Sequence, residues 1–398
     1  MRQFFLYMDE KTTYPELVAS VTPSLLQGEL NPFSASRAAE SAFDFEPELV
    51  RLDDDLSVLN LYNGPSGVFK DFGVAFFGAV LEELLKNNGR AMIVSAARGN
   101  SGSSLAGAFR NRRRITSVLI YPSGPIYGID ESEFVTNGGN TIPIQIKGSF
   151  DECQRLITEL INDRPFAERH NVTSANTINP CCLLPQAFYY FYAFTKIKKN
   201  LGGMDLVFSV PCGNFGNFIS GLYAWKFGMP VNGFIASMNM NDAFGNYIRG
   251  RGFSPHLPVA TCSPAMDISR PANYERLQSF YEEAPAVMRN MVYPASVTDE
   301  ETLRAMERAW KTYNIILDPH SAVAFSAAMK FLETGERDAH CVVLATGHPA
   351  REAEIARRAT GQIAELPEKL RGLNRRFDPI ALIDPHLDSL ESAIASCF

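Results

Sequence analysis

The chain has 398 residues, of which 46% are hydrophobic and 20% charged, and its formal net charge is −7. A chain of this length and apolar content can bury two cores, since domains usually contain about 100 to 200 residues. The acidic balance argues against nucleic acid or an anionic membrane as the principal partner, because neither would attract such a charge.

The spacing of the cysteines and histidines argues against disulfide-rich and metal-binding proteins. The seven cysteines include no CxxC pair, so neither a disulfide framework nor a zinc site is predicted. The six histidines show no metal-ligand spacing, and no metal is expected. No segment has the roughly 20 apolar residues of a membrane span, and the N-terminal apolar run is too short for a signal peptide. We therefore expect a cytoplasmic protein without a membrane partner.

Short β-rich runs alternate with helical patterns through most of the chain. The predicted strands are residues 56–62, 91–97, 115–121, 141–146, 205–210, 231–237 and 339–346. Helices with acidic first turns are predicted at 150–163 and 298–313. The pattern predicts the α/β class, with two three-layer domains whose sheets are mostly parallel. Residues 239–273 are predicted to form a long functional loop, and the tail after Asn374 is expected to be peripheral and poor in helix.

Lys70 is the first candidate for chemistry. It lies between Phe69 and Phe72, directly after a Gly/Pro turn in NGPSGVFKDFG (residues 63–73), where a strand gives way to an apolar helix. Aromatic neighbours remove water from an amine and disfavour its ammonium form, as a Schiff-base nucleophile requires. The alternative is a surface lysine whose stem covers apolar neighbours.

A glycine-rich turn, PCGNFGNF (residues 211–218), follows a predicted strand and opens a helix. Gly213 and Gly216 let backbone amides converge on a phosphate group at the helix N-terminus. The turn has neither a Walker lysine nor dinucleotide-binding spacing, so a small phosphate-bearing cofactor suits it best. A plain strand-to-helix connection is the alternative.

Two further turns offer polar side chains. ARGNSGSS (residues 97–104) can bind a carboxylate or phosphate through backbone amides, serine hydroxyls and a bidentate Arg98. In ATGHPAREAE, from residue 345, the Thr346 hydroxyl can hydrogen-bond a pyridine nitrogen without protonating it. In both turns the alternative is a residue that only caps the following helix.

Together these segments resemble the threonine synthase family of pyridoxal-phosphate (PLP) enzymes. NGPSGVFKDFG resembles the family's HGPTxAFKDFG, RGNSG (98–102) its SGDTG, and VPCGNFGN (210–217) its VPSGNFGN. SANTIN (174–179) with the following LLPQAFYYFYAF is similar to SANSINxxRLLPQxxYYFxAY. PAMDISRPANYERL, DPHSAVAF and ATGHPARE resemble PAMDISxPSNFERL, DPHTAVG and TAHPAKF.

The resemblance implies PLP fold type II, tryptophan-synthase-β-like, with the cofactor in the cleft between two domains. The implied division is a short N-terminal segment (1–50), a smaller α/β domain with the substrate-anion loop (89–180), and a larger PLP-binding domain (51–88 plus 181–398). The implied activity is that of a carbon–oxygen lyase in threonine biosynthesis. It converts O-phospho-L-homoserine and water to L-threonine and phosphate by γ-elimination and β-addition.

The resemblance also implies the site residues. Lys70 would be catalytic and hold PLP as a Schiff base. The implied cofactor ligands are Lys70, Gly213, Asn214, Phe215, Gly216, Asn217, Thr346 and Asn100. The implied substrate ligands are Arg98, Asn100, Ser101, Ser66, Ser174, Asn176 and Asn179. The expected partner is a small amino-acid phosphate, and the chain would act as a monomer or a homodimer.

Departures from the family pattern concern substrate contacts more than cofactor contacts. Asn63 replaces a histidine, Arg98 and Asn100 replace the serine and aspartate of SGDTG, and Arg351 replaces a lysine. Two alternatives therefore stay open: a sister PLP-dependent lyase or β/γ-replacement enzyme acting on a different (phospho)amino acid, and a non-enzymatic relative that keeps the fold. Asn63 and Asn100 are both candidates for contact with the phenolic oxygen of PLP.

Overall fold

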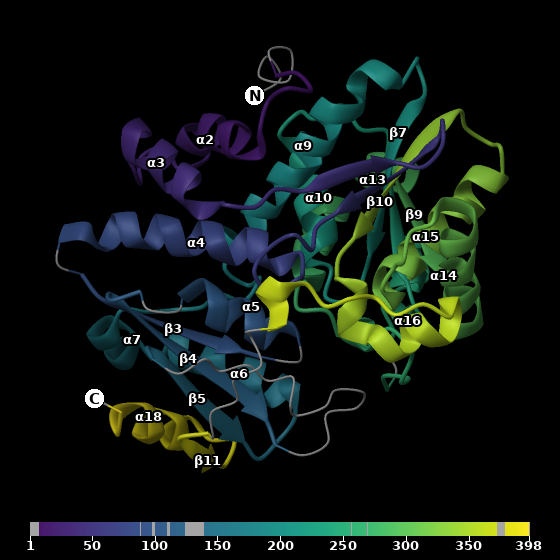
Figure 1. Ribbon diagram of the computed structural model, residues 1–398. Helices are drawn as coiled ribbons and strands as arrows, with labels where there is room; N and C mark the ends of the chain where they lie inside the picture. The colour runs from purple at the N-terminus through teal and green to yellow at the C-terminus, as the bar shows by residue number, and fades with distance from the viewer. Residues whose placement is uncertain are drawn as a thin grey trace. The chain divides into compact units, whose positions relative to one another are not determined.

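The computed structural model describes residues 8–87, 89–97, 100–109, 112–123, 139–255, 257–268, 270–371 and 379–397. The chain forms two compact units. Unit 1 comprises Met1–Leu17, Phe45–Phe69 and Leu183–Leu366, and unit 2 comprises Val18–Asp44, Lys70–Cys182 and Pro367–Phe398. Each unit contains one sheet and the helices that cover it (Figure 1).

The sheet of unit 1 has the strand order β1-β2-β10-β7-β8-β9 among the described residues. All neighbouring strands are parallel except β1 and β2. The central strands are buried almost throughout, as expected for parallel strands that are covered on both faces. The strands are β1 (Glu48–Arg51), β2 (Leu56–Asn60), β7 (Asp205–Pro211), β8 (Gly233–Met238), β9 (Val292–Ser296) and β10 (Ala339–Ala345).

Side chains of β7 alternate between the two faces of this sheet. Val207 packs in the cluster formed by α14 and α15, and the Ser209 hydroxyl donates to the Ala324 carbonyl of α15 at 2.7 Å. Phe208 points the other way, with its ring centroid 5.0 Å from that of Tyr190 on α9. Helices therefore cover both faces, and α14 and α15 lie side by side on one of them (Figure 1). The helices of unit 1 are α9 (Ala187–Ile197), α10 (Gly216–Lys226), α11 (Ala243–Ile248), α12 (Tyr274–Glu283), α13 (Pro285–Met291), α14 (Asp299–Tyr313), α15 (Pro319–Glu333) and α16 (Ala353–Thr360).

The sheet of unit 2 has the strand order β11-β5-β4-β3-β6 among the described residues, and every pair is parallel. Its strands are β3 (Ala91–Ala96), β4 (Ile115–Pro122), β5 (Thr141–Ile146), β6 (Val172–Thr173) and β11 (Ala381–Ile383). Its helices are α3 (Pro32–Ala42), α4 (Lys70–Leu84), α5 (Asn100–Phe109), α6 (Phe150–Asn162), α7 (Arg164–His170), α17 (Glu368–Arg371) and α18 (Leu387–Ala395). Two further helices, α2 (Tyr14–Leu25) and α8 (Pro180–Leu183), each contain a boundary between the units.

Helices also cover both faces of the second sheet. Val94 and Ile144 are buried on the face packed with α6 and α18, whereas Ile93 and Leu119 are buried on the face packed with α4 and α5. The predicted α/β class with mostly parallel sheets is therefore confirmed. Each unit has three layers.

The compact units differ from the predicted domain boundaries. The sequence analysis assigns residues 51–88 to the larger domain, whereas the structure groups α4 with unit 2. Phe77 and Leu81 of α4 are buried with Ile93 of β3 and Phe109 of α5. The apolar face of a helix shows that the helix is buried, but not which sheet buries it. Residues 18–44, predicted as part of a separate N-terminal segment, also belong to unit 2.

The expectation of a peripheral, helix-poor C-terminal tail is wrong. β11 pairs with β5, and α18 places Leu390 and Ile394 in the core beside Leu156 of α6. The tail thus completes the sheet and one helical layer of unit 2. Within the described residues, no helix has the length and apolar content that crossing a membrane requires.

Glu83 provides a stability test for the contact between α3 and α4. Its side chain is 8% exposed and pairs with Arg37 of α3 and with Lys86. The Arg37 hydrogen bond lowers the pKa of Glu83. The ionised group therefore stabilises the fold above its ordinary pKa, and this contribution is lost as the pH falls through the lowered value. We expect Glu83→Gln to lower the free energy of unfolding by about 1–2 kcal/mol at about pH 7, and by much less at about pH 3.

Urea denaturation at the two pH values measures this difference. Glu159→Gln is the matched control, because Glu159 pairs with Arg155 on the exposed surface of α6 in the same unit. That change should cost about 0.5 kcal/mol or less. An equal effect of both variants at neutral pH would contradict the importance of the Glu83 pair.

Candidate active site

The carboxyl ends of two neighbouring strands, β7 and β10, bring two candidate segments of unit 1 together. In the register of β10 with β7, Val343 lies opposite Ser209, so Ala345 is level with Pro211. The residues that follow, Thr346 and the loop from Cys212, therefore leave the sheet side by side. Ligands of parallel α/β sheets bind at such an edge.

The loop between β7 and α10 has an unusual backbone at Phe215. Its φ is +58° and its ψ is 3°, directly before the first residue of α10. The other described non-glycine residues with positive φ, Asn171 and Asn314, cap helix C-termini, where this conformation is common. The Phe215 ring is buried, 4.3 Å between centroids from that of Phe244. Packing thus holds a strained residue where successive N–H groups can surround an anion.

Asn217 carries a buried amide whose nitrogen has no hydrogen-bond partner in the part of the chain that the structure describes. Its Oδ1 accepts hydrogen bonds from the hydroxyls of Tyr189 and Tyr190, both at 2.7 Å. Its Nδ2 has no hydrogen-bond partner among the described residues, although the residue is only 4% exposed. An unpaired buried donor is costly, so a ligand acceptor is expected to satisfy it. A phosphate oxygen at the N-terminus of α10 fits this requirement.

Gly213 and Asn214 fix the outer side of the same loop. A Cβ atom at Gly213 would lie 2.8 Å from Met266 Cα, so only glycine fits against this segment. The Asn214 Oδ1 accepts from the Ala272 amide at 2.5 Å, and its carbonyl accepts from Asn273 Nδ2 at 2.8 Å. Asn214 therefore ties the glycine-rich loop between β7 and α10 to residues 272–273.

Thr346 connects this edge of the sheet to the segment that carries Lys70. The Phe69 amide donates to the Thr346 carbonyl at 2.9 Å, and Lys70 is the next residue in the chain. Gly67 accepts from the His348 amide at 2.9 Å, and the buried Ser66 gives its carbonyl to Arg351 at 2.6 Å. Arg351, which departs from the family pattern, thus holds the turn before the lysine. Lys70 itself is half-buried and begins α4.

Comparison with known proteins identifies the family. The family model described as "Pyridoxal-phosphate dependent enzyme" matches residues 50–347. The model described as "Threonine synthase, C-terminal" matches residues 321–394. Threonine synthase from Serratia marcescens is 35% identical over 344 residues, which cover 86% of this chain and 79% of that protein. Threonine synthase from Escherichia coli (strain K12) is 32% identical over 352 residues, which cover 88% and 81%. The chain belongs to the threonine synthase family.

Solved structures of threonine synthases have the same fold. The crystal structure from Escherichia coli matches with a TM-score of 0.88 at 29% identity and covers 100% of this chain and 90% of that one. The PLP-bound threonine synthase from Brucella melitensis matches with a TM-score of 0.84 at 27% identity and covers 99% and 90%. The predicted family, fold type II, PLP cofactor and lyase function as a threonine synthase are confirmed.

Unit 2 holds the other residues that the threonine synthase resemblance implied. Asn100 and Ser101 are the first two residues of α5, and the structure describes only their backbone. Arg98 lies outside the described residues. Ser104, a candidate anion ligand by sequence, instead donates to the buried Asp71 at 2.6 Å. This bond ties the start of α4 to α5.

The segment at residues 174–179 is organised by its own polar side chains. Asn176 accepts from the Ala96 amide at 2.9 Å and donates to the Ala96 carbonyl at 3.0 Å, as a neighbouring strand would. Asn179 Nδ2 donates to the Ser174 carbonyl at 2.8 Å, and its Oδ1 accepts from the Cys181 amide at 2.9 Å. These side chains therefore shape the loop that follows β6 and tie it to the end of β3.

Asn176 tests this role. Asn176→Ala removes both bonds to the Ala96 backbone, and we expect a loss of about 1–3 kcal/mol in the free energy of unfolding. Asn176→Asp keeps the acceptor but loses the donor, and its effect should be similar or larger because it brings a carboxylate oxygen toward the Ala96 carbonyl. Thermal unfolding of the variants measures the effect. A fully stable Asn176→Ala protein with weakened substrate binding would instead assign this side chain to the substrate alone.

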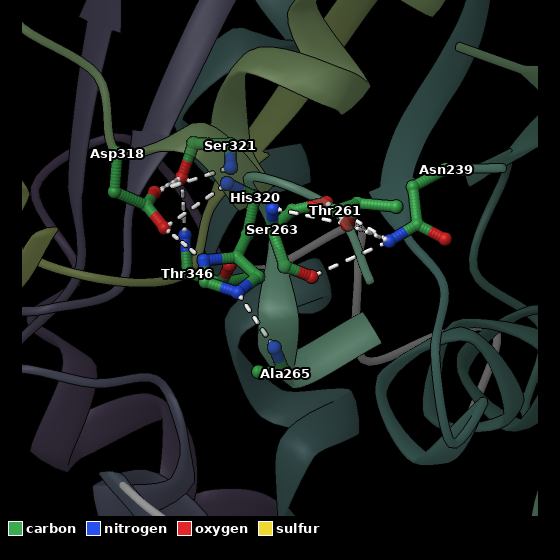
Figure 2. A network of polar contacts seen from close by, with 8 residues as sticks. All are labelled: Asn239, Thr261, Ser263, Ala265, Asp318, His320, Ser321 and Thr346. Carbon is green, nitrogen blue, oxygen red and sulfur yellow. Dashed lines mark hydrogen bonds and ion pairs between the residues drawn. The ribbon is translucent and has the colours of Figure 1, made fainter. Parts of the chain in front are cut away.

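The sequence analysis assigned no role to the start of α15, in the threonine synthase motif DPHSAVAF. Asp318 is the N-cap of α15 and lies 2.6 Å from Nδ1 of His320 (Figure 2). Burial opposes a charge on His320, but the hydrogen bond and charge of Asp318 outweigh it and raise the pKa of His320. The sequence signal was the Asp-Pro pair, which is typical of a helix start and says nothing about the partners of the histidine.

Proposed function

We propose that this chain converts O-phospho-L-homoserine and water into L-threonine and phosphate, with PLP attached to Lys70. The observation that carries the proposal is the buried Nδ2 of Asn217 at the start of α10, which no described residue satisfies, beside the strained Phe215. A buried donor and a ring of backbone N–H groups suit the phosphate of PLP. The family membership and the position of Lys70 after Phe69 support the same assignment.

In this proposal unit 1 binds the cofactor through two groups of residues. Backbone N–H groups of residues 213–217 and the Asn217 amide donate to the PLP phosphate. The Thr346 hydroxyl donates to the pyridine nitrogen, and as a neutral group it leaves that nitrogen unprotonated. The side chain of Asn214 accepts from the Ala272 amide, so Asn214 contributes its backbone N–H group to the phosphate.

Lys70 moves protons in the proposed reaction. When bound, PLP withdraws electrons from the substrate carbons to which it is conjugated. The Nζ of Lys70, displaced by the amino group of the substrate, takes and returns protons at Cα and Cβ. Asn100 and Ser101 lie at the start of α5, where N–H groups and a positive dipole end suit the anionic groups of the substrate. Arg98, Ser66 and the loop at 174–179 complete the proposed substrate site.

Product identification tests this function. Purified protein loaded with PLP and given O-phospho-L-homoserine in heavy water should yield threonine and phosphate, with deuterium at Cα and Cβ detected by NMR. Formation of 2-oxobutyrate without threonine would favour the sister lyase, the second candidate. That candidate is motivated by Asn63, whose amide donates to the Glu46 carbonyl at 3.2 Å where the family pattern has a histidine.

A cytoplasmic location is also part of the proposal. All seven cysteines lie within the described residues, and each is a free thiol. Burial raises the pKa of Cys153, Cys262 and Cys341 to about 12, so these side chains stay in the thiol form. Thiols are oxidised less readily than thiolates. Free buried thiols are the usual state of proteins in a reducing compartment.

A further inference from the structure

A buried carboxylate, that of Asp318, belongs to a polar network in unit 1 (Figure 2). Asp318 is 2% exposed, and each of its oxygens has partners on α15. Oδ1 accepts from the Ser321 amide at 3.1 Å and from the Ser321 hydroxyl, and Oδ2 lies 2.6 Å from His320 Nδ1. The carboxylate thus orients two side chains that extend to different parts of the site.

The first side chain, Ser321, holds the backbone of Thr346. Because the Ser321 hydroxyl donates to Asp318, its oxygen is turned to accept from the Thr346 amide, which lies 2.9 Å away. Gly347 packs against the same carboxylate: a Cβ there would lie 3.1 Å from Asp318 Oδ2. Asp318 and Ser321 therefore determine where the end of β10 leaves the sheet.

The second side chain, His320, holds the segment behind the phosphate-binding loop. Its Nε2 lies 3.1 Å from the Ala265 amide nitrogen, which can only donate. Nε2 must therefore be the acceptor, and Nδ1 carries the proton that is donated to Asp318. A protonated ring would point an N–H group at the Ala265 N–H, so this contact favours the neutral ring. The charge of Asp318 has the opposite effect, because it favours the protonated ring.

Ala265 and Met266 are the residues against which Gly213 packs. The Cβ position of Gly213 lies 3.1 Å from the Ala265 carbonyl oxygen and 2.8 Å from Met266 Cα. A shift of η5 (Pro264–Met266) would therefore move the wall of the phosphate-binding loop. The same segment is held on its other side, where Asn239 Nδ2 donates to Ser263 Oγ at 3.0 Å (Figure 2).

We propose that Asp318 and His320 form a positioning pair that fixes the ring-binding and phosphate-binding groups of the PLP site relative to each other. Ser321 transmits the position of Asp318 to Thr346, and His320 transmits it through Ala265 to Gly213. This inference rests on the proposed function, which assigns Thr346 and residues 213–217 to the cofactor. His320 acts through the Ala265 backbone, so it is a positioning residue.

Two substitutions at one position separate the hydrogen bonds of His320. Asparagine places its amide where Nδ1 lies, so His320→Asn can keep the donor to Asp318 but leaves the Ala265 amide without an acceptor. Glutamine reaches the position of Nε2, so His320→Gln can restore that acceptor. The readout is the ratio of the dissociation constants of pyridoxal and PLP, which measures what the phosphate contributes to binding, at one mildly alkaline pH.

We expect His320→Asn to weaken PLP binding by about 5- to 100-fold, because a buried N–H group loses its partner and the loop wall loosens. Pyridoxal binding should change much less, so the ratio falls. His320→Gln should recover most of the wild-type ratio. At saturating PLP, the KM for O-phospho-L-homoserine should stay near the wild-type value, because, among the described residues, none of those assigned to the substrate hydrogen-bonds to His320 or to Ala265.

His340→Asn is the matched control. His340 is a fully buried histidine of β10 in the same unit, near the other end of the strand, with Nε2 2.9 Å from Ser57 Oγ and Nδ1 2.9 Å from the Asp54 carbonyl. Its substitution should lower the melting temperature but leave the pyridoxal-to-PLP ratio unchanged. An unchanged ratio in His320→Asn, or an equal fall in His340→Asn, overturns the proposal.

A second variant covers the case in which His320→Asn does not fold. Ser321→Ala removes the acceptor of the Thr346 amide while leaving His320 in place. We expect it to shift the absorption maximum of bound PLP, since the ring contact changes, and to leave the pyridoxal-to-PLP ratio near wild type. An unshifted spectrum counts against the pair. Wild-type protein that binds no PLP would instead refute the proposed function.

Discussion

Lys70→Ala is expected to abolish the Schiff-base absorption band of the PLP-loaded protein and to lower turnover by at least about 10³-fold. The variant loses both the covalent attachment of the cofactor and the amine that moves protons, and positioned proton transfer alone contributes about 10² to 10⁴ in rate. Alanine favours helices, so the start of α4 should still form. Absorption spectroscopy and a phosphate-release assay measure the two effects.

Two control variants show whether the loss is specific to the amine of Lys70. Lys70→Arg keeps a cation at the start of α4 but cannot form the Schiff base, so it should be as inactive as alanine. Lys86→Ala removes a lysine that pairs with Glu83 beyond the other end of the helix, and it should retain the band and the activity. Wild-type turnover by Lys70→Ala would show that another residue attaches the cofactor.

Gly213→Ala is expected to weaken PLP binding by about 5- to 150-fold. The added Cβ would lie 2.8 Å from Met266 Cα, which is backbone and cannot rotate away. Forcing an extra methyl group into packed surroundings costs about 1–3 kcal/mol. Here the shift falls on the loop whose amides are proposed to hold the phosphate. Titration of the apoprotein with PLP, followed by absorbance, gives the dissociation constant.

Gly107→Ala is the matched control for this substitution. Gly107 lies inside α5, and a Cβ there would have no described atom within 4 Å apart from its chain neighbours and the backbone of its own helix. Alanine should stabilise the helix by up to about 1 kcal/mol and leave the affinity for PLP unchanged. If Gly213→Ala also binds PLP like the wild type, the phosphate is held elsewhere.

The interior strands were predictable because a parallel strand covered on both faces must be apolar along its whole length. β5 has the predicted bounds, and β3, β4, β7 and β10 differ from prediction by one residue at one end. Capping residues likewise marked helix starts: Ser149 and Thr298 each form a capping box at the N-terminus of a predicted helix.

The strands that sequence analysis missed lie at the edges of the two sheets. β1 and β9 flank the sheet of unit 1, and β6 and β11 flank that of unit 2. They have two to five residues and are partly exposed, so neither length nor a run of apolar residues marks them. Pro294 within β9 further weakens its strand pattern, although an edge strand tolerates proline. Pairing with an interior strand, a tertiary interaction, creates them.

The sequence by itself determined the chemistry that is encoded within short segments. The loop at 211–217, the turn before Lys70 and the Thr346 turn each consist of neighbouring residues, and they carry the resemblance that implied the family, the cofactor and the PLP fold type. The α/β class followed from the alternation of strand and helix patterns.

Only the tertiary structure decided which residues far apart in the sequence pack together or hydrogen-bond to each other. It placed α4 and the C-terminal residues in unit 2, gave Asn176 to the backbone of Ala96, and joined Thr346 to Ala265 through Asp318 and His320. Such contacts depend on the register of strands and on the packing of helices. A buried polar group needs a partner, but the chain alone does not say which of many distant groups will meet that need.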